Sequence, residues 1–201
     1  MSNGQKFFPN ERAIIIVAHP DDETIWMGGT ILKNKNLNWT IFSLCRSSDS
    51  DRAPKFKKVC DYYGAKCLIT DLDDEGRLND KESREAAEKL IEEKLRGQDF
   101  DFLFTHGLNG EYGHPVHVQV HNAVKNIIDR KTIKSENVFY FNYQKKRGKN
   151  EIMNRDDSDF TVELSPKELK EKKEIVSNMY GYEMDGIDVG YCINKETFKI
   201  N

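Results

Sequence analysis

A histidine and three consecutive acids follow directly on an apolar run near the start of the sequence. Residues 14–17 are all isoleucine or valine and predict a buried strand, and His19, Asp21, Asp22 and Glu23 come right behind it. Charged side chains in such a place need partners or a chemical role. His19 and Asp22 are of types that bind zinc, and Asp21 could accept a proton from a bound water.

The other histidines of the chain gather in a second place. His106, His114, His117 and His121 follow another apolar run that predicts a strand. In open parallel sheets, ligands bind at the carboxyl ends of the strands. This group and His19 would therefore meet in one crevice if their two strands are neighbours.

A metal site can be assembled from the two groups. His19, His117 and Asp22 would supply two imidazoles and one carboxylate, a set that suits zinc and leaves a fourth position for water. Zinc lowers the pKa of bound water to about 7. Asp21 could then take the proton of that water, and His114 could face the substrate from the other side. The same ligand set also suits iron(II).

Each of these side chains also has a simpler explanation. Acids such as Asp22 before a helix can serve as N-terminal caps, and a lone histidine at a strand end is often a satisfied polar residue. His117 and His121 are four residues apart and would share a helix face, so an HxxxH zinc pair is a competing hypothesis, although it lacks the glutamate of HExxH. His106 would either line the crevice or pack locally.

The order of apolar runs and helical stretches predicts the elements that position these residues. Strands are expected near residues 13–18, 39–45, 66–70, 101–106 and 136–143. Helices are expected near residues 24–35, 53–64, 81–95 and 116–129. Continuously apolar strands that alternate with helices are typical of βαβ units. The prediction is a single α/β domain over residues 1–201, three-layer α/β/α and Rossmann-like, with a mostly parallel sheet.

Two segments nearer the C-terminus carry local signals. Residues 144–159 are polar and charged, which predicts a surface loop. Ser165, Pro166 and Glu168 have the spacing of a capping box with proline at the first helical position. The lysines of the helix that follows are expected to form a solvated face.

Composition excludes several classes of partner. The 201 residues include 31 Lys and Arg against 34 Asp and Glu, a formal net charge of −3, so the basic field of a nucleic-acid binder is lacking. The sequence shows no apolar run long enough for a signal peptide or a membrane span. A cytoplasmic location is expected.

Two motifs resemble those of the PIG-L/LmbE-like family of zinc-dependent N-acetylglucosaminyl deacetylases. They are AHPDDE at residues 18–23 and GEYGHPVH at residues 110–117, and the resemblance covers residues 13 to about 145. It implies that His19, Asp22 and His117 are the metal ligands and that Asp21 is the general base. These assignments coincide with the reading of the residues by their chemistry.

The resemblance also implies roles for further residues. His114 would stabilise the developing oxyanion and protonate the leaving amine, and Tyr112 would donate a hydrogen bond to the tetrahedral intermediate. Arg52 resembles the arginine with which family members hold the sugar or its attached group, and Arg46 is the alternate candidate. Homo-oligomers are common in the family, so the resemblance also implies that a homo-oligomer is possible.

The chain departs from the family pattern at Val116, where an Asp or Asn usually stands between the two histidines. An acid there would hold the imidazole of His114 and raise its pKa. Glu111 or Glu23 could substitute for it. The segment RSSDSDR at residues 46–52 also lacks the glycine-rich, glutamate-containing form common in the family.

The expected function is that of a zinc hydrolase that removes the N-acetyl group from an N-acetylglucosamine-type sugar or conjugate. A metal-dependent hydrolase of another amide or an ester would use the same site. A sugar- or nucleotide-binding module without catalysis is the alternative from another class. A generic Rossmann nucleotide binder is disfavoured because no GxGxxG follows the first apolar run.

Overall fold

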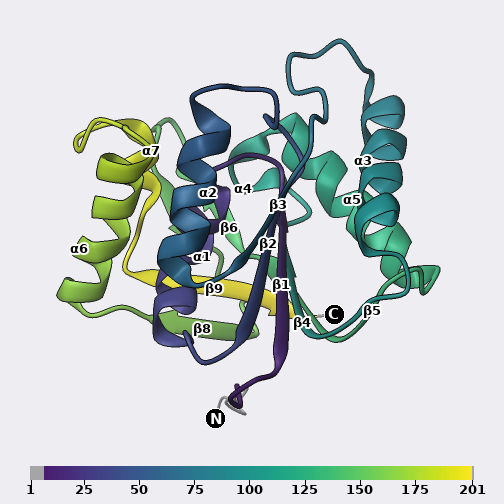
Figure 1. Cartoon of the computed structure of the whole chain (residues 1–201). Coiled ribbons are helices and arrows are strands. Elements are labelled where there is room, and N and C mark those ends of the chain that lie inside the picture. Colours follow the sequence, from purple (N-terminus) through teal and green to yellow (C-terminus); the bar gives the residue numbers. More distant parts are fainter. Residues whose placement is uncertain (1–6, 201) are drawn as a thin grey trace.

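A seven-stranded sheet lies at the centre of the computed structural model, which describes residues 7–200 (Figure 1). The strand order is β3-β2-β1-β4-β5-β9-β8. The parallel strands are β1 (Arg12–Val17), β2 (Asn38–Ser43), β3 (Lys66–Ile69), β4 (Asp99–Thr105) and β5 (Lys134–Phe141). The predicted α/β fold with a mostly parallel sheet is confirmed.

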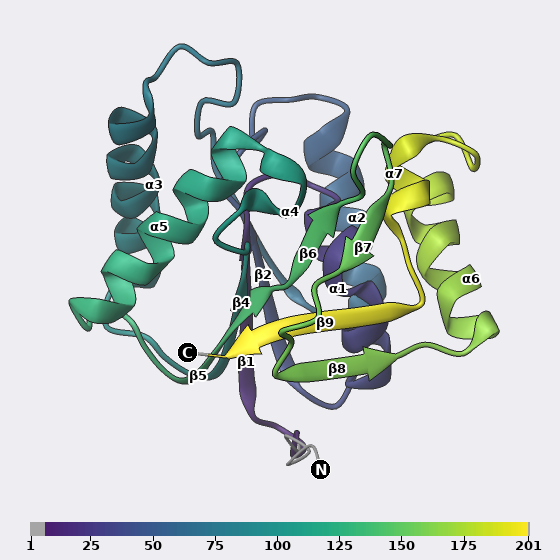
Figure 2. The same ribbon diagram turned by 180° about the vertical axis from the view of Figure 1, so that it is seen from behind.

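Helices cover both faces of the sheet. The helices α1 (Asp22–Lys33), α2 (Arg52–Tyr63) and α6 (Pro166–Glu174) lie on one side, and α3 (Asp80–Leu95) and α5 (Pro115–Asp129) lie on the other (Figures 1 and 2). Successive side chains of a strand point to opposite faces. Ile15 and Val17 therefore pack in the core beneath α1 and α2, whereas Ile14 and Ile16 pack in the core beneath α3 and α5.

Strands β1 and β4 are neighbours, with Ile15 opposite Phe104 in the register. The chain goes from β1 outward through β2 to β3 and then returns to β4 on the other side of β1. The order of connections reverses between these two strands, which is where open α/β sheets form a ligand-binding crevice.

Two helices begin with capping boxes. At α6, the side chain of Ser165 accepts a hydrogen bond from the backbone of Glu168, whose carboxylate accepts one from the backbone of Ser165. This confirms the predicted cap, including Pro166 at the start of the helix. At α3, Asn79 and Glu82 form the same arrangement. No helix within residues 7–200 is long and apolar enough to cross a membrane.

The prediction of a loop over residues 144–159 is wrong in part. A small antiparallel hairpin of β6 (Tyr143–Lys145) and β7 (Ile152–Asn154) lies here, with Gln144 opposite Met153 (Figure 2). Ile152 is buried against the core beneath α1. Strands of three residues are too short to show a periodic pattern.

The antiparallel edge of the main sheet comes from the C-terminal part. β9 (Lys195–Ile200) pairs with β5, and β8 (Phe160–Glu163) pairs with β9. Between them the chain forms α6, the π-helix η1 (Ile175–Met179) and the short helix α7 (Ile187–Tyr191). In this segment, α6, η1 and α7 all pack against α1.

The expectation that all lysines of α6 are solvated is wrong for Lys172, which is fully buried. Its Nζ lies 2.7 Å from Oε1 of Glu196, a buried residue of β9. The Glu196 carboxylate also accepts hydrogen bonds from the backbone N–H groups of Gly29 and Thr30. Helix α1 breaks at Met27 (φ −148°, ψ 20°), which frees these N–H groups, and the buried ion pair closes the break.

Candidate active site

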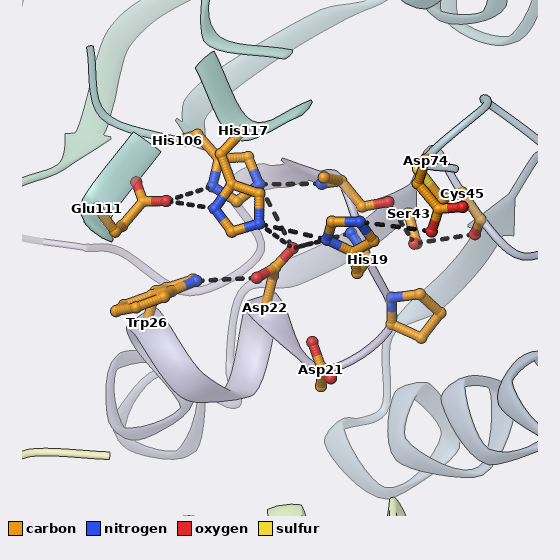
Figure 3. A network of polar contacts seen from close by, with 12 residues as sticks. His19, Asp21, Asp22, Trp26, Ser43, Cys45, Asp74, His106, Glu111 and His117 are labelled. Atoms are coloured by element: carbon orange, nitrogen blue, oxygen red, sulfur yellow. Dashed lines mark hydrogen bonds and ion pairs between the residues drawn. The ribbon is translucent and has the colours of Figure 1, made fainter. Parts of the chain in front are cut away.

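The loops after β1 and β4 meet at one end of the sheet, as their positions in the sequence predict (Figure 3). His19 Nδ1 lies 3.2 Å from His117 Nε2 and 3.3 Å from Asp22 Oδ2. His117 Nε2 and Asp22 Oδ2 are 3.4 Å apart. Zinc bonds of about 2.0–2.1 Å in tetrahedral geometry would place ligand atoms roughly 3.3–3.4 Å from one another. The three predicted ligand atoms therefore form a triangle of the size that zinc requires.

Asp22 is oriented by two hydrogen bonds. The indole Nε1 of Trp26 donates to its Oδ1 at 2.9 Å, and the backbone N–H of His19 donates to its Oδ2 at 2.8 Å. Burial raises the pKa of this carboxyl group, but His117 and His106 outweigh burial and hold the pKa well below its usual range. Asp22 is therefore ionised at neutral pH, the form that can bind a metal.

Glu111 orients the imidazole of His117 through the nitrogen Nδ1, on the side opposite Nε2. Its Oε2 lies 2.7 Å from Nδ1 of His117 and 2.9 Å from Nδ1 of His106, and its Oε1 accepts from the backbone N–H of Gly107 at 2.7 Å. Burial raises its pKa, but the two histidines lower it to about 2 overall. A proton on Nδ1 of His117 leaves the Nε2 lone pair free for a metal. No local pattern in the sequence indicates that Glu111 orients His117.

His106 contacts two of the predicted ligands, His117 and Asp22. Its ring is stacked on His117 with centroids 3.9 Å apart, and its Nε2 lies 2.9 Å from the backbone N of Ala18. Nitrogens of His106 and His117 and an oxygen of Asp22 come within 4.8 Å of one another, close enough to hold a metal ion. Because Nε2 of His106 accepts the N–H of Ala18, this ring is better suited to support the site than to act as a ligand.

The competing HxxxH pair is wrong. Nδ1 of His121 lies 2.9 Å from the backbone oxygen of His106, and its ring packs against Tyr140. His121 belongs to none of the groups within residues 7–200 that could hold a metal ion. His114, in contrast, comes within ligand range of His19 and His117.

Asp21 lies on the pocket side of the same turn, in a strained backbone conformation with φ 120° and ψ −31°. Its Oδ2 accepts a hydrogen bond from Arg52 Nη1 at 2.8 Å and another from the hydroxyl group of Tyr182. Burial and the charge of Asp22 raise its pKa to about 6, against the opposing effects of Arg52 and Tyr182. Its carboxyl group thus titrates near the pH at which a general base works best.

The two predicted substrate arginines reach the site but are engaged with acids. Arg52 contacts Asp21, and Arg46 Nε lies 2.6 Å from Oδ2 of Asp74. The same oxygen of Asp74 lies 3.5 Å from Nε2 of His19, so this acid can orient that ligand. Asp74 follows β3 in the sequence DLDD, an acidic run at a strand end whose position could have pointed to it. Substrate binding by Arg52 or Arg46 stays a prediction.

His114 lines the pocket without an orienting partner. Its Nδ1 is buried and has no hydrogen bond to the described residues. Burial and the neighbouring His117 and His19 lower its pKa to about 3. The hypothesis that Glu111 or Glu23 takes the place of the missing acid is wrong, because Glu111 binds other histidines and Glu23 binds Tyr180.

The pocket in front of these residues has a volume of about 250 Å³. Seven of the eight predicted site residues line it, and His117 lies behind them: the seven are His19, Asp21, Asp22, Arg46, Arg52, Tyr112 and His114. Five further lining residues were not predicted from the sequence: Trp26, Asp74, Tyr182, Asp188 and Tyr191. The last three come from the C-terminal segment, which carries no motif that would have indicated them.

Solved structures with this fold include several deacetylases. The N,N'-diacetylchitobiose deacetylase from Pyrococcus horikoshii is 15% identical with a TM-score of 0.61, and 95% of this chain and 84% of that chain are covered. The A40926 pseudoaglycone deacetylase is 14% identical with a TM-score of 0.62, over 96% of this chain and 98% of the other. These likenesses establish the fold.

A hydratase shares the fold as well. The 4-carboxy-2-hydroxymuconate hydratase from Pseudomonas putida is 14% identical with a TM-score of 0.62, over 94% of this chain and 95% of the other. No protein with a curated description matches the sequence significantly. Similarity to these structures therefore does not select one reaction.

The family assignment comes from the sequence match. The PIG-L family, described as GlcNAc-PI de-N-acetylase, matches residues 14–128, which is more than half of the chain and includes both loops that carry the predicted metal ligands. The chain therefore belongs to the PIG-L family, and this family match confirms its predicted class as an N-deacetylase enzyme.

Proposed function

We propose that the protein is a zinc-dependent hydrolase that removes the N-acetyl group from an N-acetylglucosamine-type sugar or conjugate. The observation that carries the proposal is the triangle of His19 Nδ1, His117 Nε2 and Asp22 Oδ2, with sides of 3.2–3.4 Å, two of whose residues, His19 and Asp22, line the pocket. Three protein ligands with an open position are typical of catalytic rather than structural zinc.

The residues around the triangle suit amide hydrolysis. Zinc held by these three side chains would supply a water of lowered pKa and would polarise the amide carbonyl. Asp21, one residue from the ligand Asp22, takes the proton of the attacking water. His114 is the candidate proton donor to the departing amine, although its lowered pKa of about 3 weakens it in this role. Tyr112 donates a hydrogen bond to the oxygen that becomes negative in the tetrahedral intermediate.

The pocket wall suits a sugar. Arg46, Asp74 and Asp188 offer charged hydrogen-bonding groups, whereas Trp26 and Tyr191 present stacked aromatic rings with centroids 5.9 Å apart. A sugar carries hydroxyl groups around its edge and apolar C–H groups on its faces, so a mixed polar and aromatic wall complements it. The small-molecule amino-sugar conjugate is therefore the substrate class that we favour over a macromolecule.

One observation favours a second candidate. The buried Nδ1 of His114 has no partner among the described residues, and Val116 stands where the family carries an acid or an amide. An imidazole without an orienting partner is a weak general acid. The second candidate is a sugar-binding module that keeps the metal site and lacks turnover.

Metal content and acetate release, measured on the same samples, test the proposal. We expect about one zinc per chain in the native protein, loss of zinc in His19→Ala and His117→Ala, and acetate release from N-acetylglucosamine conjugates by the native protein only. His121→Gln is the matched control and should retain zinc, because His121 lies outside the triangle. Zinc without turnover on any conjugate would support the binding module. Absence of zinc from the native protein would contradict the ligand assignment.

A further inference from the structure

Two tyrosines of the C-terminal part reach the acids of the AHPDDE loop. The hydroxyl group of Tyr180 donates to Oε1 of Glu23 at 2.8 Å, and that of Tyr182 donates to Oδ2 of Asp21. The two tyrosines are two residues apart, and so are the two acids. Residues 180–182 therefore form a clamp on residues 21–23, and we call this pair of contacts the tyrosine clamp.

The backbone on each side of the clamp is specialised. The π-helix η1 ends at Met179, directly before Tyr180. Short π-helical turns are frequent at functional sites. Gly181 has a φ of 86°, a conformation that other residues rarely adopt, and it allows the chain to turn between the two tyrosines. On the other side, Asp21 has a φ of 120°, so its strained backbone must be held in place by its surroundings.

Asp21 is held through one carboxylate oxygen. Arg52 Nη1 donates to the same Oδ2 as Tyr182, and it also donates to the backbone oxygen of Pro20 at 3.1 Å. The guanidinium group of Arg52 lies over the ring of Tyr182, 5.1 Å from its centroid. The other oxygen, Oδ1, has no hydrogen bond within residues 7–200, and Asp21 lines the pocket. Two donors thus fix one oxygen and leave the other available.

We propose that Tyr182 is a positioning residue of this enzyme: with Arg52 it fixes Oδ2 of Asp21, so that Oδ1 is presented to the water whose proton it accepts. The inference rests on the proposed function, in which Asp21 is the general base. Tyr182 lies outside residues 14–128, the part that matches the family, so this role is supplied by the C-terminal segment.

Two other roles for Tyr182 predict different effects when its hydroxyl group is removed. If Tyr182 contacts substrate as part of the pocket wall, its hydroxyl group affects KM. If it is only structural, its removal lowers stability or metal content together with activity. A positioning role lowers kcat alone, because a displaced base fails in the transition state while substrate still binds.

The test uses Tyr182→Phe in the zinc-loaded full chain, with an N-acetylglucosamine conjugate as substrate. We expect kcat to fall about tenfold or more, with KM within about twofold and with zinc content and melting temperature unchanged. Tyr62→Phe is the matched control, because Tyr62 also donates to a carboxylate, Oε1 of Glu171 at 2.8 Å, but on the exposed surface between α2 and α6. The control should match the native protein.

A crystal structure of Tyr182→Phe gives a readout that does not depend on turnover. The Asp21 carboxylate should rotate away from the orientation that it has in the native protein. An unchanged kcat, a rise in KM alone, a loss of zinc, or an unmoved Asp21 would each overturn the inference. If the native protein releases no acetate from any conjugate, the proposed function fails, and the orientation of Asp21 in the two crystal structures still decides whether Tyr182 positions it.

Discussion

The loops after β1 and β4 are built on the same plan but are held in different ways. Each contributes histidine to the triangle, and each contains an acid with a positive φ: Asp21 at 120° and Glu111 at 57°. Such conformations cost about 1–3 kcal/mol each for residues other than glycine. They persist because the acid in each loop is fixed by several hydrogen bonds.

The partners of the two acids lie at very different distances along the chain. Glu111 binds His106, Gly107 and His117, which are four to six residues away. Asp21 binds Arg52 and Tyr182, which are 31 and 161 residues away. The loop after β4 is therefore a self-contained support for one ligand, whereas the loop after β1 depends on α2 and on the C-terminal segment. Changes in the first should act on the metal, and changes around the second should act on the base.

The largest effect is expected from Glu111→Gln. Glutamine keeps the shape of the side chain but loses the charge that holds two imidazoles, so zinc affinity should fall about 10- to 100-fold. The free energy of unfolding should fall by about 2–3 kcal/mol, because hydrogen bonds to a buried charge are lost. Competition with a chelator and urea denaturation measure the two effects.

The control for this change is Glu151→Gln, which removes an exposed carboxylate that pairs with Lys146 on the β6–β7 hairpin. Zinc affinity and the free energy of unfolding should both stay within the experimental error of the native values, since exposed ion pairs contribute little to stability. Native zinc affinity in Glu111→Gln would mean that the loop after β4 holds His117 by other means, and the contrast between the loops would fail.

A second effect, confined to stability and dependent on pH, is expected at Glu23, two residues from Asp21. Burial raises the pKa of Glu23 to about 7, against the hydrogen bonds from Thr24 and Tyr180. The folded state then binds this proton more tightly than the unfolded state, so the stability that Glu23 contributes falls as pH rises from about 4.5 to about 7. Glu111 behaves in the opposite way: its lowered pKa contributes stability above about pH 4.5 that is lost as the pH falls toward 2.

Urea denaturation of metal-free protein between pH 4.5 and pH 8 isolates the contribution of Glu23. The difference in unfolding free energy between the native protein and Glu23→Gln should decline by about 2–3 kcal/mol over this range. Glu93→Gln, an exposed change on α3, should give a difference that is flat with pH. A flat difference for Glu23→Gln would show that Glu23 is ionised throughout and that the loop after β1 is less enclosed than its contacts indicate.

The same contrast explains which parts of the molecule could be predicted from the sequence. The strands of the parallel sheet are continuous apolar runs, and the site follows from the rule that loops at the carboxyl ends of neighbouring strands meet. The proximity of His19, Asp22 and His117 could therefore be predicted, since residue type and strand position are enough to indicate it. The capping box of Ser165 and Glu168 was equally local.

The long-range contacts could not be predicted, because nothing in the local sequence signals them. Tyr182 is 161 residues from Asp21, and Lys172 is 24 residues from Glu196. A lysine in a charged helix and a glutamate in a strand both read as exposed residues. Their burial is decided only when β9 joins the edge of the sheet and α6 packs on α1.

The smallest effect concerns the two histidines inside the loop after β4. His117 is held by Glu111, whereas His114 has an unpartnered Nδ1 and a pKa lowered to about 3, so it is a poor proton donor at neutral pH. Val116→Asp restores an acid where the family carries one and should raise the pKa of His114 toward neutrality. We expect kcat to rise by about tenfold or less, with zinc affinity unchanged.

Val116→Asn separates charge from orientation in this last test. An amide can accept the Nδ1 proton but adds no negative charge, so a gain with Asp and none with Asn would assign the effect to the pKa of His114. Equal gains would assign it to orientation of the ring. If neither variant is faster than the native protein, protonation of the amine does not depend on His114, and Tyr112 becomes the proton donor to test, since its ring lies 5.7 Å from that of His114 on the same wall.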